Sequence, residues 1–118
     1  MVAAFAMKSR PRLALPPVVQ RYVEAANRHD AAAAAACFAP AAVVDEQFGL
    51  HRGRAAIRAW IEQIDRQFAP GLLVLAPKPS LADLTLVISV SGRFPGSPVQ
   101  LDFHFALCGD RIGRLVIE

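Results

Sequence analysis

Two adjacent carboxylates, Asp45 and Glu46, interrupt an apolar run that is typical of a β-strand. Successive side chains of a strand point to opposite faces, so Glu46 shares its face with Ala42, Val44 and Phe48, whereas Asp45 faces the other side. A buried charge without a partner is costly. Burial also disfavours the charged form of a carboxyl, which makes the carboxylate a stronger base. Glu46 is therefore a candidate general base in an apolar pocket, and a bulge in the strand would exchange its role with that of Asp45.

Tyr22 and His51 are the candidate partners of this carboxylate. Tyr22 lies on an apolar face with helical spacing, between Val19 and Ala26, and we expect it to point inward. Its hydroxyl could then donate a hydrogen bond to the oxygen of a developing enolate. His51 follows the strand and could serve as a general acid or base, or bind a polar group of a substrate.

Each of these residues also has a structural interpretation, and the sequence leaves both open. Tyr22 could be a core residue with its hydroxyl at a wet edge, His51 a loop histidine, and Asp45 a solvated carboxylate. Glu46 could instead be held by one of four neighbours: Tyr22, Trp60, Arg52 or Arg54.

No metal or phosphate site is expected. The three histidines lack the i, i+4 spacing of a metal pair, and the glycines form no phosphate-binding loop. His104 and Asp102 lie two residues apart on the outer face of a predicted strand, where we expect them at a dimer surface. We therefore predict chemistry without a cofactor.

The formal charge of +3 does not indicate a nucleic-acid-binding protein. Lys8, Arg10 and Arg12 account for all of it, because the other ten Lys and Arg (13 minus 3) match ten Asp and Glu. No apolar run is long enough to span a membrane. Cys37 and Cys108 are too few for a disulfide scaffold and are expected to be reduced and buried. A cytoplasmic protein is predicted, beginning at Met1 or Met7.

Turn residues divide the chain into an arm over residues 1–14 and one domain over residues 15–118. The arm is expected to be flexible. A first helix begins at Leu15-Pro16-Pro17 and breaks at residues 27–30, and a second covers residues 31–36 and is closed by Pro40. After the carboxylate strand we expect a loop over residues 49–53, a helix over 54–68, and strands over 72–76, 84–94, 99–108 and 111–118.

The third helix and the strand over residues 99–108 have clear apolar faces. We expect these faces to form the core, with some side chains lining the pocket. Charged residues of the helix, Asp65 among them, are expected on its wet side. Helices followed by a meander of strands predict an α+β domain. The candidate pocket residues are Phe48, Ile57, Trp60, Ile64, Phe103 and Phe105.

The chain resembles the nuclear transport factor 2-like superfamily, which includes ketosteroid isomerase and the SnoaL-like polyketide cyclases. The resemblance covers nearly the whole chain from about Leu15. It is carried by Val18-Val19-Gln20-Arg21-Tyr22-Val23, the helix break at residues 27–30, Cys37-Phe38-Ala39-Pro40 and Gly53-Arg54-Ala55-Ala56-Ile57-Arg58-Ala59-Trp60.

This resemblance implies a cone in the form of a cystatin-like roll: three N-terminal helices packed on a strongly curved, mainly antiparallel sheet. It also implies an apolar pocket and a homodimer formed through the sheet. The family's isomerases use a carboxylate base, a tyrosine and a protonated aspartic acid. Glu46 and Tyr22 align with the first two. Phe103 takes the place of the third and Asp102 lies one residue away, so a slip of register would exchange them.

The expected function is binding of an apolar, carbonyl-bearing small molecule, with acid–base proton transfer of the isomerase or cyclase kind. The alternative is a non-catalytic ligand-binding or dimerisation module. One fold hosts many functions, so the resemblance does not decide between them.

Overall fold

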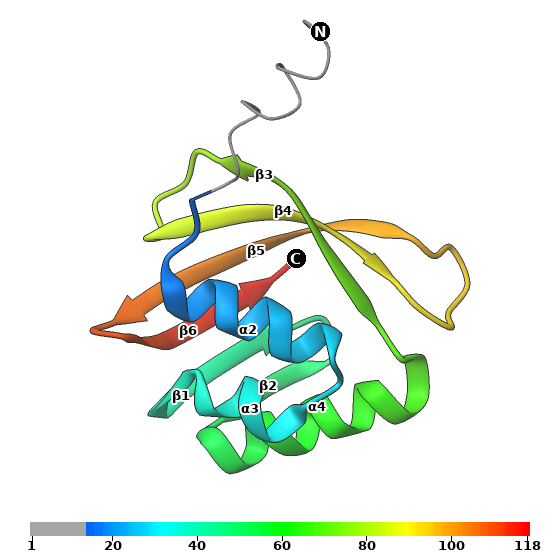
Figure 1. The fold of residues 1–118 in the computed structure, drawn as a ribbon, viewed down its shortest axis with the longest axis horizontal. Helices are drawn as coiled ribbons and strands as arrows, with labels where there is room; N and C mark the ends of the chain where they lie inside the picture. Colours follow the sequence, from blue (N-terminus) through cyan, green and yellow to red (C-terminus); the bar gives the residue numbers. More distant parts are fainter. Residues whose placement is uncertain (1–13) are drawn as a thin grey trace, which may run out of the picture.

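The computed structural model describes residues 14–118. The predicted arm and the choice between Met1 and Met7 fall outside these residues, except for Ala14. Three helices and six strands follow in the order α2, α3, β1, β2, α4, β3, β4, β5 and β6. The sheet is strongly curled without closing, and the helices lie within its curve (Figure 1).

The helices begin and end where the sequence predicts. Helix α2 (Pro17–Asn27) starts with Pro at N1, where the missing N–H costs nothing. Helix α3 (Ala31–Ala36) is capped by Asp30, whose side chain accepts a hydrogen bond from the Ala33 backbone N–H. Helix α4 (Arg54–Phe68) is followed by its C-cap residue Ala69, which adopts the left-handed conformation.

The strands form one mixed sheet in the order β2-β1-β6-β5-β4-β3. The first and last strands, β1 (Phe38–Glu46) and β6 (Arg111–Ile117), pair in parallel. All other neighbours pair antiparallel, including β3 (Gly71–Lys78), β4 (Leu84–Ser91) and β5 (Val99–Cys108). This parallel pairing places the end of the chain in the middle of the sheet.

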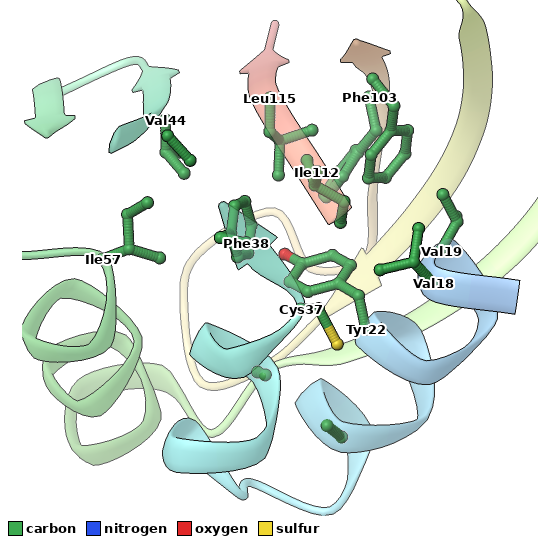
Figure 2. Close-up of a cluster of buried hydrophobic side chains, with 14 of the residues drawn as sticks. Val18, Val19, Tyr22, Cys37, Phe38, Val44, Ile57, Phe103, Ile112 and Leu115 are labelled. Carbon is green, nitrogen blue, oxygen red and sulfur yellow. The ribbon is translucent and has the colours of Figure 1, made fainter. Parts of the chain in front are cut away.

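The core lies between the helices and the concave face of the sheet (Figure 2). Val19 of α2, Ile57 of α4 and Leu115 of β6 are completely buried there. The Tyr22 ring packs edge-on against Phe38 and Phe105, at centroid distances of 5.5 and 6.1 Å. Such edge-to-face packing is favourable for aromatic pairs, and it fixes the Tyr22 ring against the sheet.

Three local predictions are wrong. Residues 49–52 form strand β2 (Gly49–Arg52), not a loop, because their backbone pairs with the end of β1. Pro40 lies inside β1, and α3 has already ended at Ala36. Cys108 is exposed because it lies beside the β5–β6 turn, whereas Cys37 is buried as expected.

Candidate functional site

A cavity of about 1120 Å³ opens between helices α2 and α4 and the concave face of the sheet. It exceeds the usual range for small-molecule sites, which extends to about 1,000 Å³. Aromatic and aliphatic side chains make up most of its wall, among them Trp60, Ile64, Phe68, Leu101 and Phe103. A ligand that fills this space therefore needs a substantial apolar body.

Glu46 and His51 form a hydrogen-bonded pair in the cavity wall. Glu46 Oε1 lies 3.2 Å from His51 Nε2, and the two side chains are 10% and 24% exposed. A carboxylate only accepts hydrogen bonds, so this contact requires the His51 tautomer with the proton on Nε2. The His51 ring stacks on Trp60 at a centroid distance of 5.2 Å and an angle of 23°. Glu46 is thus partnered by His51, and not by the tyrosine, tryptophan or arginines that the sequence offered.

The β1–β2 hairpin creates this pair. Val44 lies opposite His51 and Glu46 opposite Gly49, so Glu46 and His51 are diagonal neighbours on the concave face. The Phe48 backbone N–H also donates to both Glu46 carboxylate oxygens at 3.2 Å. The Glu46–His51 contact could not be predicted from the sequence. The connecting residues Gln47-Phe48 are not one of the glycine-containing dipeptides that are typical of a tight hairpin.

Tyr22 is 3% exposed and lines the same cavity. Its hydroxyl has no hydrogen-bond partner within residues 14–118. No fully enclosed side-chain N or O atom in this part of the chain lacks a partner, so the hydroxyl keeps some accessible surface, and Tyr22 is one of the residues that line the cavity. Burial raises the pKa of Tyr22 well above its usual range, and the nearby Cys37 and Asp65 raise it further. Tyr22 therefore presents a neutral hydroxyl donor.

Asp65 is a cavity residue that the sequence prediction placed wrongly. It follows Ile57 and Ile61 at i+8 and i+4 on α4, which puts it on the buried stripe. Its side chain is 16% exposed, and Oδ1 lies 3.1 Å from His29 Nδ1. This helical spacing from the two buried isoleucines is the sequence signal that indicates an inward position for Asp65. His29, from the α2–α3 connection, supplies the partner that a half-buried carboxylate needs.

Asp45 and Phe48 lie less favourably for chemistry. The Asp45 carboxylate is 43% exposed and 3.4 Å from Arg114 on the convex face, which matches its predicted alternation. Phe48 belongs to the β1–β2 turn and is 83% exposed, so the inward row of β1 ends at Glu46. Both residues still border the cavity.

The other candidate residues separate into cavity and core. Trp60, Ile64 and Phe103 line the cavity, whereas Ile57 and Phe105 are fully buried outside its wall. The register on β5 places Phe103 inward. Asp102 faces outward to Lys78 at 2.6 Å, and His104 contacts Thr85 and Glu118 on that same face.

No group of three or more potential metal ligands is found among residues 14–118. In that same part of the chain, every helix is too short or too polar to cross a membrane.

A profile of the SnoaL-like domain matches residues 19–106, three quarters of the chain. Similar solved structures include a candidate polyketide cyclase from Sinorhizobium meliloti, with 35% identity, a TM-score of 0.82 and coverage of 88% of this chain and 95% of that one. A protein with a ketosteroid isomerase-like fold from Catenulispora acidiphila, in complex with trimethylamine, has 16% identity and a TM-score of 0.75, covering 87% and 85%. The Δ5-3-ketosteroid isomerase of a Mycobacterium species has 18% identity and a TM-score of 0.71, covering 86% and 89%. No curated protein matches by sequence.

Proposed function

The chain belongs to the SnoaL-like domain family, and from this premise we propose that it binds an apolar, carbonyl-bearing small molecule and catalyses proton transfer next to the carbonyl. The observation that carries the proposal is the Glu46–His51 pair in the wall of a large apolar cavity. A base held by a second polar group and shielded from water is what such a reaction needs.

In the proposed reaction Glu46 takes a proton from the carbon next to the substrate carbonyl. The C–H bond breaks, and its electron pair moves to the carbonyl oxygen as an enolate forms. The neutral Tyr22 hydroxyl donates a hydrogen bond to this oxygen, which stabilises the charge that develops there. Glu46 then returns the proton to the same or another carbon, which gives exchange or isomerisation.

His51 orients the base. Its Nε2–H holds one oxygen of Glu46, while stacking on Trp60 fixes the imidazole ring. Among residues 14–118, the second carboxylate oxygen accepts a hydrogen bond only from the Phe48 N–H. Small-molecule binding is further supported by the relative from Catenulispora acidiphila, which was crystallised with trimethylamine.

The test is deuterium exchange, because it does not require the natural product to be known. Apolar ketones with steroid-like or polyketide-like skeletons are incubated in D₂O, and loss of the proton next to the carbonyl is followed by NMR. We expect exchange above background with the wild type, and a loss of about 10²-fold or more in Glu46→Gln. Glu62→Gln is the matched control, since Glu62 pairs with Arg58 on the exposed side of α4.

Two outcomes contradict the catalytic proposal. Exchange that persists in Glu46→Gln removes the assigned base. Binding without exchange in the wild type favours the alternative, a non-catalytic ligand-binding module.

A further inference from the structure

Asp65 brings a second largely buried carboxylate to the cavity, on the wall opposite the sheet. His51 of the Glu46–His51 pair stacks on Trp60 of α4, and Asp65 lies five residues further along the same helix. At about 1.5 Å per residue, the two positions are about 7.5 Å apart along the helix axis. The cavity thus has two largely buried carboxylates, Glu46 and Asp65, at separate places in its wall.

The Asp65 carboxylate is held in place, yet it keeps capacity for a ligand. His29 contacts Oδ1 only, and Oδ2 has no hydrogen-bond partner within residues 14–118. His29 itself lies in the left-handed region with φ of 57°, in a connection that Asn27 anchors through two hydrogen bonds to the Leu72 backbone. A carboxylate fixed in this way is preorganised to accept further hydrogen bonds.

The Tyr22 hydroxyl is a second, independent sign of a ligand at this wall. Tyr22 is almost completely buried and lines the cavity, and its hydroxyl is accessible and has no hydrogen-bond partner among the described residues. A hydroxyl can accept as well as donate. An ammonium group beside Asp65 could donate a hydrogen bond to the Tyr22 oxygen, and the Tyr22 O–H would stay free to donate to the carbonyl oxygen of the ligand.

The charges of the wall favour a cation. Its described lining residues include four acids, Asp45, Glu46, Asp65 and Glu118, and neither Lys nor Arg. Arg114 and His104 balance Asp45 and Glu118 on the convex side. Carboxylates within low-dielectric walls concentrate positive ligands, and aromatic rings such as Phe68 are also present in this wall.

We propose that Asp65 anchors a protonated amine of the ligand and makes the cavity selective against anions. The ligand class is an apolar molecule with an ammonium group near Asp65 and a carbonyl group near Glu46. The position of the carbonyl group near Glu46 rests on the proposed function. The preference for an ammonium group is independent of the proposed reaction, because it can be tested by binding measurements alone.

The experiment compares three ligands with one skeleton: 4-phenylbutylamine, 4-phenylbutanol and 4-phenylbutanoate. Binding is followed by the fluorescence of Trp60, the only tryptophan of the chain and a cavity residue. We expect the amine to bind about tenfold more tightly than the carboxylate, as one charge-assisted hydrogen bond implies.

Asp65→Asn keeps the shape of the side chain and removes its charge. We expect this variant to lose most of the preference for the amine and to bind the alcohol like the wild type, which also shows that the cavity is intact. Asp65→Glu should retain the preference, as should the control Glu62→Gln on the exposed side of α4.

Equal binding of amine and carboxylate by the wild type would overturn the proposal, as would a preference that survives in Asp65→Asn or no detectable binding of the amine. If Asp65→Asn no longer binds the alcohol, Asp65→Glu decides: loss of the amine preference there overturns the proposal, and retention supports it. Deuterium exchange in Glu46→Gln tests the proposed reaction separately, so the two failures can be told apart.

Discussion

The ionisation of Tyr22 can be followed directly, because Tyr22 is the only tyrosine of the chain. Burial raises its pKa, so the folded protein should show no tyrosinate absorbance near pH 10, where an unfolded tyrosine ionises. Above about pH 10 only the unfolded state releases the proton. The free energy of unfolding should therefore be insensitive to Tyr22 below this pH and should decrease above it.

The measurement is the tyrosinate absorbance of the native chain as pH rises, with the same titration in urea as the control. A native chain that ionises near pH 10 while its circular dichroism stays unchanged would contradict the burial of this hydroxyl.

The two cysteines should differ strongly in reactivity. Cys37 is 6% exposed, burial raises its pKa, and its Sγ donates to the Ala33 carbonyl, whereas Cys108 is exposed. Because the thiolate is the reactive form, a thiol reagent at neutral pH should modify Cys108 quickly and Cys37 slowly. Cys108→Ser should remove the fast phase of the labelling kinetics. If both cysteines reacted at the same rate, or if the fast phase remained in Cys108→Ser, the labelling would contradict the buried position of Cys37 and the exposed position of Cys108.

Helix α3 is short, so its N-cap should matter for stability. Asp30 supplies the side-chain acceptor for the Ala33 N–H, at 3.0 Å. Loss of such a cap costs about 1 kcal/mol. In urea denaturation, Asp30→Ala should lower the free energy of unfolding by about that amount, and Asp110→Ala should have little effect because Asp110 is an exposed turn residue. Equal stabilities of the two variants would show that the cap contributes nothing.

Elements with a sustained pattern or a clear start signal could be predicted from the sequence, and strand β2, which has neither, could not. The helix over residues 54–68 has both a periodic apolar stripe and a clear end, and its predicted and observed bounds agree. Strand β2 has four residues and no alternation of its own. It becomes a strand only because β1 lies beside it.

The candidate site shows the same limit for single residues. Alternation along residues 42–46 of β1 correctly predicts that Glu46 points inward, because the irregularity of this strand lies before Val43. The charge of Asp65 alone predicts, wrongly, that it lies on the wet side of the helix. Its actual surroundings depend on His29, 36 residues away in sequence, and such tertiary partners are not visible in local spacing.

At the scale of the whole molecule, the homodimer through the sheet stays a prediction. Leu73 on edge strand β3 lies opposite Ser89 and is 63% exposed, and the neighbouring Leu75 is 41% exposed. Exposed apolar side chains of this kind are often covered by a partner. Sedimentation should give the mass of a dimer for the wild type, and Leu73→Glu should shift it toward the monomer. Leu81→Glu, in the β3–β4 connection, is the control. A monomeric wild type would refute the prediction.

The cavity depends on the whole curled sheet, because its wall takes residues from α2, α4 and strands distant in sequence. The central claim is that Glu46 meets the reacting carbon of a ligand in this space. The most direct measurement is a crystal structure with a bound ketone that undergoes exchange. We predict that the carbon next to its carbonyl lies about 3–3.5 Å from a Glu46 carboxylate oxygen. A ketone bound outside the cavity, or one inside it with Glu46 turned away, would contradict the claim.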